Sequence, residues 1–158
     1  MDIQEKIDSY IKNRLEQYRG WYDRKAVKMK KYYLRSRVSS AIIAVLVPVI
    51  SNLNFPQFPE IDVSKISVTI LSTTVAILIA LESVLNFRKQ WKNYRTTEQY
   101  LMAQKQLFLN RSGDYYKFSE EEAFQMLVNR VETAITEENA VTLNVLTKID
   151  NNSNNKYF

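Results

Sequence analysis

Two apolar segments, residues 38–53 and 66–87, lie only twelve residues apart, and they constrain the fold more than any other feature. A helix needs about 20 residues to cross about 30 Å of hydrocarbon at 1.5 Å per residue. The second segment has that length. The first is shorter, but aromatic residues precede it, and Arg35 and Arg37 can extend toward lipid headgroups. The sequence therefore predicts two transmembrane helices.

Other interpretations of the two segments are less favourable. Two buried core helices in a soluble protein would need apolar cover on every side, and the rest of the chain has too little apolar surface to provide it. A secretory signal peptide is disfavoured because a charged stretch of 37 residues precedes the first segment and a second apolar segment follows.

The flanking charges predict the orientation of the hairpin. Eleven of the 22 Lys and Arg residues precede residue 38, and a further cluster follows residue 87, whereas the linker 54–65 carries one Lys against Glu60 and Asp62. The positive-inside rule places both termini in the cytoplasm and the short linker outside. The basic residues expected at the membrane interface, where they bind anionic headgroups, are Arg35, Arg37, Arg88, Lys89 and Lys92. Because the basic residues border apolar segments, the net charge of +5 indicates a lipid partner and not a nucleic acid.

The remaining residues predict cytoplasmic helices. Residues 1–37 form an amphipathic pattern, with apolar residues at three- and four-residue spacing. Residues 88–150 predict further helices, with a break at 110–114 and a new start marked by a capping box of Ser119 and Glu122. The tail, 151–158, is of low complexity and predicted to be disordered. The expected core stripes comprise Ile3, Ile7, Ile11, Leu15, Tyr18 and Tyr22; Trp91, Tyr94, Leu101 and Phe108; and Ala123, Leu127, Val131, Ala134, Val141 and Val145.

The predicted fold is therefore all-α: a transmembrane hairpin of 38–53 and 66–87 whose helices continue into a cytoplasmic helical bundle. One hairpin cannot enclose a channel, so a channel would require a homo-oligomer.

The second segment has two different sides at about 100° per residue. One side is small and polar, whereas the other is aliphatic and suits lipid. The aliphatic side consists of Ile70, Leu71, Ile77, Leu78, Leu81, Val84 and Leu85. Close helix packing would explain the polar side, because small residues let backbones approach. A hydrated pore lined by hydroxyl groups is the alternative. The first segment has a similar side, made by Ser40, Ala44, Pro48 and Ser51. The candidate pore-lining residues are Glu82, Thr69, Ser72, Thr73, Ser83 and Asn86.

Glu82 is the strongest of these candidates. A carboxylate at the bilayer centre costs about 2.5–3.5 kcal/mol on insertion scales, so such residues usually face a cavity or a partner. In an oligomer, one Glu82 per subunit would form an acidic ring that favours cations. Alternatively, Glu82 reaches interfacial water or pairs with Arg88 or Lys89 of a neighbour, since it lies only five residues before Phe87.

The composition argues against an enzyme. The chain has no cysteine and no histidine, which removes thiol catalysis, the usual general base and the commonest metal ligands. Two isolated glycines cannot build a phosphate-binding loop. We therefore expect no catalytic residues, no metal and no cofactor.

A set of motifs accompanies the two spans: Trp21-Tyr22-Asp23-Arg24-Lys25-Ala26, Lys30 to Tyr33, Trp91, Tyr94-Arg95, Thr97-Glu98, Leu101, Gly113, Tyr115-Tyr116, Phe124, Val128, Arg130-Val131-Glu132 and Glu137-Glu138. Together with the spans they cover most of residues 15–146, and they resemble the motifs of the bacterial SLATT family. One departure is Ala140-Val141-Thr142, where the family would have a tryptophan shortly after Glu138.

This resemblance implies a two-span membrane module of the bacterial cytoplasmic membrane, acting as a pore-forming effector in conflict systems. Taken together with the polar side of the second segment, the resemblance predicts an oligomeric pore or ion channel that conducts inorganic ions and prefers cations. The alternative is a membrane-anchored helical scaffold that recruits a cytoplasmic partner without conducting ions. In that case the polar side would be fully occluded, and Glu82 would tolerate Gln or Leu.

Overall fold

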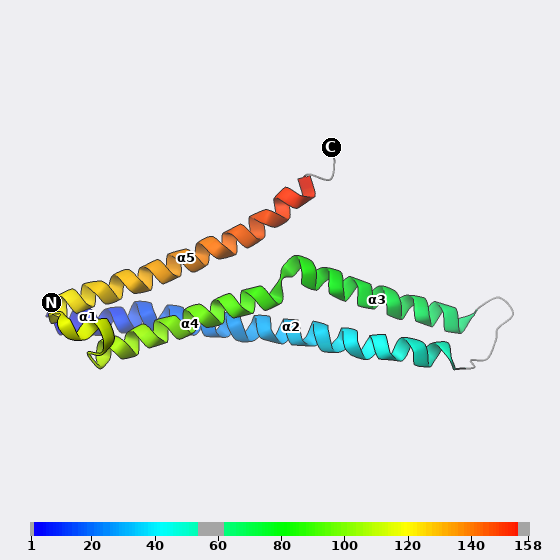
Figure 1. The fold of residues 1–158 in the computed structure, drawn as a ribbon, viewed down its shortest axis with the longest axis horizontal. Helices are drawn as coiled ribbons and strands as arrows, with labels where there is room; N and C mark the ends of the chain where they lie inside the picture. The colour runs from blue at the N-terminus through cyan, green and yellow to red at the C-terminus, as the bar shows by residue number, and fades with distance from the viewer. Residues whose placement is uncertain (1, 54–61, 155–158) are drawn as a thin grey trace. The chain divides into compact units, whose positions relative to one another are not determined.

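A computed structural model gives the fold of residues 2–53 and 62–154, the last twelve by their backbone alone (Figure 1). Every element in these ranges is helical and none is a strand, which confirms the all-α prediction. The elements in chain order are α1 (Ile3–Tyr10), the π-helical turn η1 (Ile11–Leu15), α2 (Glu16–Ser51), α3 (Val63–Leu85), α4 (Phe87–Leu109), the 3₁₀ turn η2 (Gly113–Lys117) and α5 (Glu120–Asn154).

The chain divides into two compact units. Unit 1 comprises Met1–Lys28 and Lys89–Phe158, and unit 2 comprises Met29–Arg88. The helix α2 contributes its first part to unit 1 and the remainder to unit 2.

Unit 1 is a bundle of three helical stretches whose buried residues largely match the predicted stripes. The first stretch runs from α1 into α2, and α4 and α5 supply the others. Ile135 is buried in place of the predicted Ala134, because the buried positions on α5 repeat every four residues. The apolar core consists of Ile7, Ile11, Leu15, Tyr22, Ala26, Tyr94, Leu101, Phe108, Tyr115, Ala123, Leu127, Val131 and Ile135.

The π turn keeps three residues of the first stretch, spaced four apart, on one face of the helix. Four-residue spacing drifts around an α-helix, whose turn contains 3.6 residues. The wider turn at Ile11–Leu15 corrects this drift, so Ile7, Ile11 and Leu15 remain on one face.

The predicted break and capping box between α4 and α5 are both present. Arg111 and Gly113 have positive φ, 49° and 62°, and these left-handed residues turn the chain out of α4. At the start of α5, the Ser119 amide donates to the Glu122 carboxylate at 3.0 Å, and the Glu122 amide donates to the Ser119 hydroxyl at 3.4 Å. This reciprocal pair satisfies two amide donors that the helix itself leaves free.

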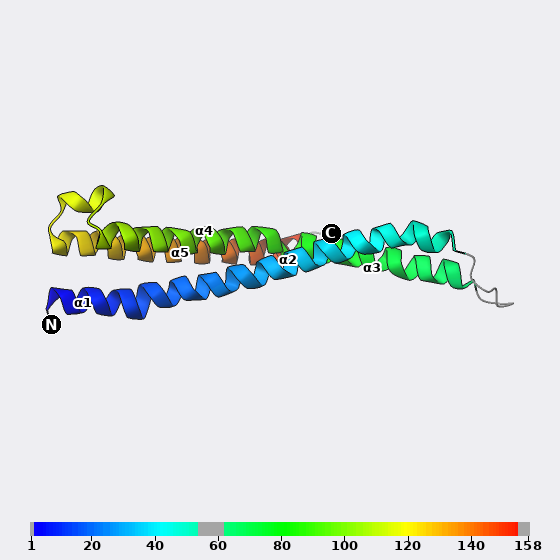
Figure 2. The same ribbon diagram turned by 90° about the horizontal axis from the view of Figure 1, so that it is seen from below.

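Unit 2 is a helical hairpin made by the second part of α2 and by α3, which lie side by side in both views (Figures 1 and 2). The helical stretches Ile3–Ser51 and Val63–Lys117 each contain a segment long and apolar enough to cross a membrane, and no residue of either segment is buried. At its start, α3 is capped by the Asp62 side chain, which accepts a hydrogen bond from the Lys65 amide. The linker residues 54–61 lie outside the described part of the chain.

The end of α3 differs from the sequence prediction. The predicted span extends to residue 87 and continues into the next helix, whereas α3 ends at Leu85 and α4 begins at Phe87. Asn86 between them is left-handed, with φ 49° and ψ 42°, and its amide donates to the Glu82 carbonyl at 2.9 Å. Asparagine is one of the few residues that tolerate this conformation, so a single residue separates the two helices.

The end of α5 also differs from the prediction. The helix runs through Asn154, so the first four residues of the tail predicted to be disordered are helical. Neither glycine nor proline occurs there to terminate the helix. The remaining tail residues, 155–158, lie outside the described part of the chain, as does the side chain of Val145.

Candidate functional site

The two helices of unit 2 pack along a line of half-buried residues, here called the seam. These residues recur at alternating spacings of three and four, the pattern by which two helices pack side by side. Across it the Ser36 hydroxyl donates to the Leu78 carbonyl, 3.5 Å away. The seam consists of Tyr33, Ser36, Ser40, Ile43, Val47 and Ile50 of α2, and of Ser64, Val68, Leu71, Val75, Leu78 and Glu82 of α3.

Residues that directly follow a seam residue are mostly small or carry a hydroxyl group, and all of these small residues are exposed. Ile79, which follows Leu78, is an exception on α3. We call this group the small face. It consists of Ala41, Ala44, Pro48 and Ser51 of α2, and of Thr69, Ser72, Ala76 and Ser83 of α3.

The small residues of both helices lie on the same side of the hairpin. One residue further along an α-helix means a rotation of about 100° in a fixed sense. Seen from one end of the hairpin, α2 runs away from the viewer and α3 runs toward the viewer, so these rotations are mirror images. Both rotations therefore carry the small residues away from the seam to the same side.

By the same argument, residues that directly precede seam residues lie on the opposite side. Most of them are large aliphatic residues, and Ile70, Ile77 and Leu81 are each about half exposed. The aliphatic face consists of Ile42, Leu46, Val49, Ile70, Ile77 and Leu81. The hairpin therefore has two chemically different sides, one that suits hydrocarbon and one that suits protein or water.

Three residues lie elsewhere than the sequence indicated. Leu71 and Leu78 were expected on the aliphatic side and instead belong to the seam, and Ser40 is half-buried there as well. The sequence pattern could not separate these positions, because a seam and a lipid face are both apolar. Only contact with the other helix distinguishes them.

The candidate pore-lining residues fall into two groups. Thr69, Ser72, Thr73 and Ser83 are exposed, with Thr73 one position further round α3 than Ser72. The Thr69 hydroxyl donates to the Lys65 carbonyl at 2.8 Å, so what it offers outward is an acceptor lone pair.

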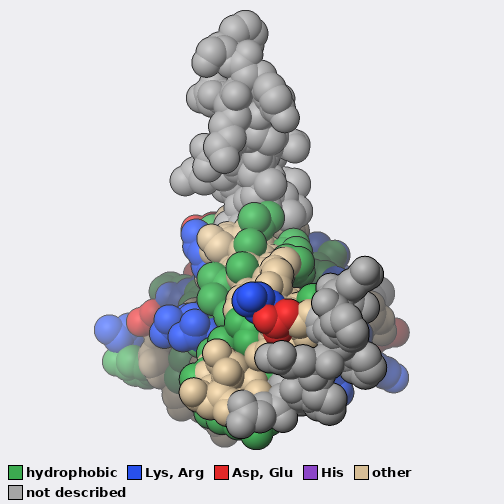
Figure 3. Space-filling view, turned by 90° about the vertical axis from the view of Figure 1, so that its right-hand side faces the viewer, with side chains coloured by type: hydrophobic (Ala, Val, Ile, Leu, Met, Phe, Trp, Pro, Cys, Tyr) green, Lys and Arg blue, Asp and Glu red, His purple; other side chains and the backbone are tan. Residues whose placement is uncertain are grey.

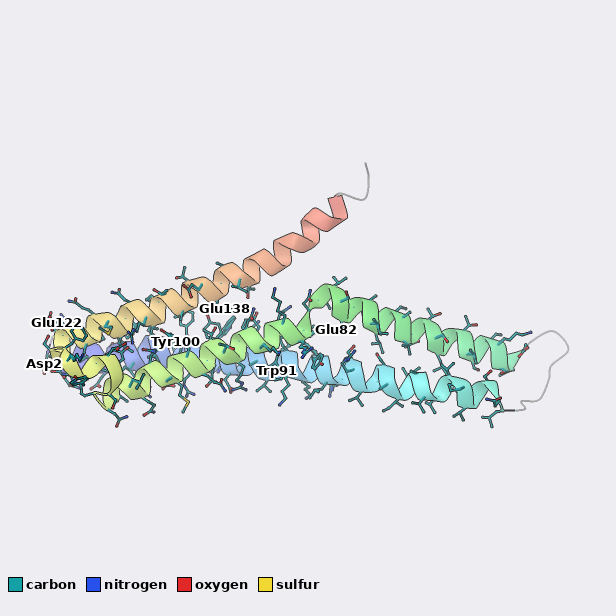
Figure 4. All side chains as sticks on the ribbon, viewed as in Figure 1. Asp2, Glu82, Trp91, Tyr100, Glu122 and Glu138 are labelled. Carbon is teal, nitrogen blue, oxygen red and sulfur yellow. The ribbon has the colours of Figure 1, made fainter. Side chains whose placement is uncertain are left out.

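Glu82 and Asn86 form the second group. Glu82 is half-buried at the seam, near the end of α3 (Figure 4). The Asn86 side chain donates to the Val84 carbonyl at 3.2 Å and its backbone ends the helix, so a structural role accounts for this residue.

The candidate interface residues Arg35, Arg37, Arg88, Lys89 and Lys92 are all exposed. At the other end of the hairpin, an ion pair joins Lys65 and Asp62 at 3.1 Å. The view onto that end shows a basic and an acidic side chain side by side among hydrophobic and uncharged ones (Figure 3).

Unit 1 contains polar contacts between helices that the sequence pattern did not reveal. The Arg14 guanidinium binds the Glu132 carboxylate through two nitrogens, at 2.9 and 2.7 Å, and the Tyr10 hydroxyl donates to the same carboxylate. Glu16 accepts from Lys105 and Arg19. Such two-pronged pairs fix the register of helices more than they add stability when partly exposed.

These contacts shift several pKa values. The hydrogen bonds from Arg14 lower the pKa of Glu132. Burial would raise the pKa of Glu16, but the hydrogen bonds from Lys105 and Arg19 outweigh it and lower that pKa. Burial raises the pKa of four tyrosines, Tyr10, Tyr22, Tyr94 and Tyr115.

The pKa shifts predict a wide plateau of stability against pH. Carboxylates with a lowered pKa stabilise the fold above their unfolded pKa of about 4.3, and this stability is lost as pH falls. Tyrosines with a raised pKa stabilise it below about pH 10, and this stability is lost as pH rises further. Thermal unfolding in detergent should therefore give a constant melting temperature from about pH 5 to 10, with no step near neutral pH because histidine is absent. A step between pH 6 and 8 would contradict this.

No group of three or more acidic side chains that could hold a metal ion occurs in the part of the chain that the structure describes.

Comparison with known proteins gives one match. A family model described as "Protein of unknown function (DUF4231)" matches residues 17–123, which include most of α2, all of α3 and α4, and the start of α5. No curated protein and no solved structure matches the chain.

Proposed function

Because this chain belongs to the DUF4231 family of proteins of unknown function, we propose a function from its own structure: it is an oligomeric membrane pore that conducts ions. The small faces of several hairpins surround the path and also meet one another where neighbouring hairpins pack, and the aliphatic faces contact lipid. The observation that carries this proposal is that both helices place their small and hydroxyl-bearing residues on one side of the hairpin. If lipid surrounded the whole hairpin, no physical constraint would place small residues on one side and large aliphatic residues on the other.

Cation selectivity is part of the proposal. The Thr69 hydroxyl offers a lone pair to the path, and Glu82 lies near the end of α3 that the positive-inside rule places at the cytoplasm. Glu82 lies in the seam beside the path, so its negative charge attracts cations while its side chain leaves the path open. The resemblance to the SLATT family supports a role as an effector in a bacterial conflict or signalling system.

Cysteine accessibility tests the proposal directly, because the native chain has no cysteine. Ser72→Cys places a thiol on the small face, and Ile77→Cys places one on the aliphatic face, five residues further along α3. In liposomes containing the protein, a charged thiol reagent should block ion flux through Ser72→Cys and leave flux through Ile77→Cys unchanged. Equal block of both variants would reject the small face as the path.

Glu82→Gln tests the selectivity in the same liposomes. We expect flux to persist and the preference for cations over anions to weaken. Flux with unchanged selectivity would retain the pore and remove Glu82 from it. If the inserted oligomer shows no flux across a range of voltages, the protein is a membrane-anchored scaffold.

A further inference from the structure

A groove of about 620 Å³ lies between α4 and α5 in unit 1. Its lining includes Asn and Thr side chains from both helices, and Tyr100 contributes an aromatic ring. Figure 4 shows Tyr100 on α4 and Glu138 on α5, which both line the groove. Its volume is within the range of small-molecule sites, about 300–1,000 Å³.

Most inward-facing carboxylates of unit 1 have a cationic partner. Glu98, whose side chain is 7% exposed, is held by Arg19 at 3.4 Å and by Arg95 at 3.1 Å. Glu132 and Glu16 also have cationic partners, as described above. Buried carboxylates are costly unless a positive charge is close, so these pairs are expected.

Glu138 is the exception, and it is the one that lines the groove. It is only 5% exposed, and no ion pair to it occurs within the described residues. Its carboxylate accepts one hydrogen bond, from the Thr142 hydroxyl at 2.7 Å. Beside it lies the buried hydroxyl of Tyr22. Burial raises the pKa of Tyr22, and the charge of Glu138 adds to that effect.

The cation of the groove does not compensate Glu138. Arg130 donates to Asp114 at 2.6 Å and to Gln104 at 3.3 Å, and its guanidinium lies 5.4 Å from the centre of the Tyr115 ring. Its charge is therefore compensated near η2, about 12 Å along α5 from Glu138. The exposed Glu137 adds a second negative charge to the groove.

We propose that this groove binds a small aliphatic amine, whose ammonium group pairs with Glu138. An ammonium group has three donors, which suit the carboxylate and the hydroxyl groups around it. The alkyl chain of the amine lies along the neutral part of the groove, against Tyr100. A divalent metal fits less well, because it needs more oxygen ligands than this groove places together. The site does not depend on ion conduction by the hairpin.

Calorimetry on the full-length protein in detergent tests the proposal, with cadaverine and spermidine as probes and 1,5-pentanediol as the neutral control. We expect both amines to bind and the diol not to bind. Glu138→Gln should weaken amine binding about tenfold or more, because a hydrogen bond to a charged group is lost. Glu98→Gln, at an equally buried carboxylate with its own arginines, should leave amine binding unchanged.

Thermal unfolding without amine adds a second measurement. Glu138→Gln should raise the melting temperature because it removes an unpaired buried charge, whereas Glu98→Gln should lower it by removing the buried carboxylate that Arg19 and Arg95 share. Absence of amine binding, or equal binding to Glu138→Gln, would overturn the proposal. A lower melting temperature and a smaller assembly for Glu138→Gln would also overturn it, since a second copy of the chain would then supply the cation.

Discussion

Ala76→Leu is expected to abolish ion flux and to reduce the protein to smaller assemblies. Ala76 lies in the middle of the small face, where close approach of neighbouring hairpins requires small side chains. A leucine there adds three carbon atoms at the point of contact and separates the hairpins. Flux in liposomes and the mass of the assembly by light scattering measure the two effects.

Ile77→Leu is the matched control for this change. It places the same side chain one residue further along α3, on the aliphatic face, where Ile77 is 54% exposed. Because lipid chains adapt to either isomer, flux and assembly should equal those of the native protein. A loss in both variants would show that the hairpins associate without regard to the small face.

Leu101→Ala is expected to give the largest loss of stability. Leu101 of α4 is fully buried in unit 1. Truncating such a leucine costs about 2–5 kcal/mol, as lost burial and as the cavity that remains. For a unit of this size that corresponds to a fall in melting temperature on the order of 10 °C.

The neighbouring Met102→Ala provides the control. Met102 is 47% exposed, so its truncation removes little buried surface, and the melting temperature should fall by only a few degrees. Circular dichroism against temperature in detergent compares both variants with the native chain. Equal losses would mean that the assembled protein buries the exposed side of α4 as well.

The helices and their ends were largely predictable from the sequence. Spacing of apolar residues identified Ile7, Leu15 and Leu101 as core, because a helix buries one face at a regular interval. Ser119 and Glu122 form the predicted capping box, since such caps depend on neighbours within one turn. These features depend on residues close together in the chain, so they can be predicted from the sequence.

Buried charges were not predictable in this way. Glu98 and Glu138 follow the same periodicity as the core, but a charged residue normally indicates a solvated face. The position of Glu98 could have been suspected, because it lies in the register of Tyr94 and Leu101. Its partner Arg19, 79 residues earlier in the chain, could not.

The sequence by itself determined an all-α chain with two helices able to span a membrane, because hydrophobic length and periodicity are local properties. Only the tertiary structure decided which side of each helix meets its neighbour. It placed Leu71 and Leu78 in the seam and left Ser72 and Ala76 outside it. It also separated α3 from α4 at Asn86, where the sequence predicted one continuous helix. The physical reason is that these features depend on contacts between segments far apart in the chain, and the sequence of one helix does not specify those contacts.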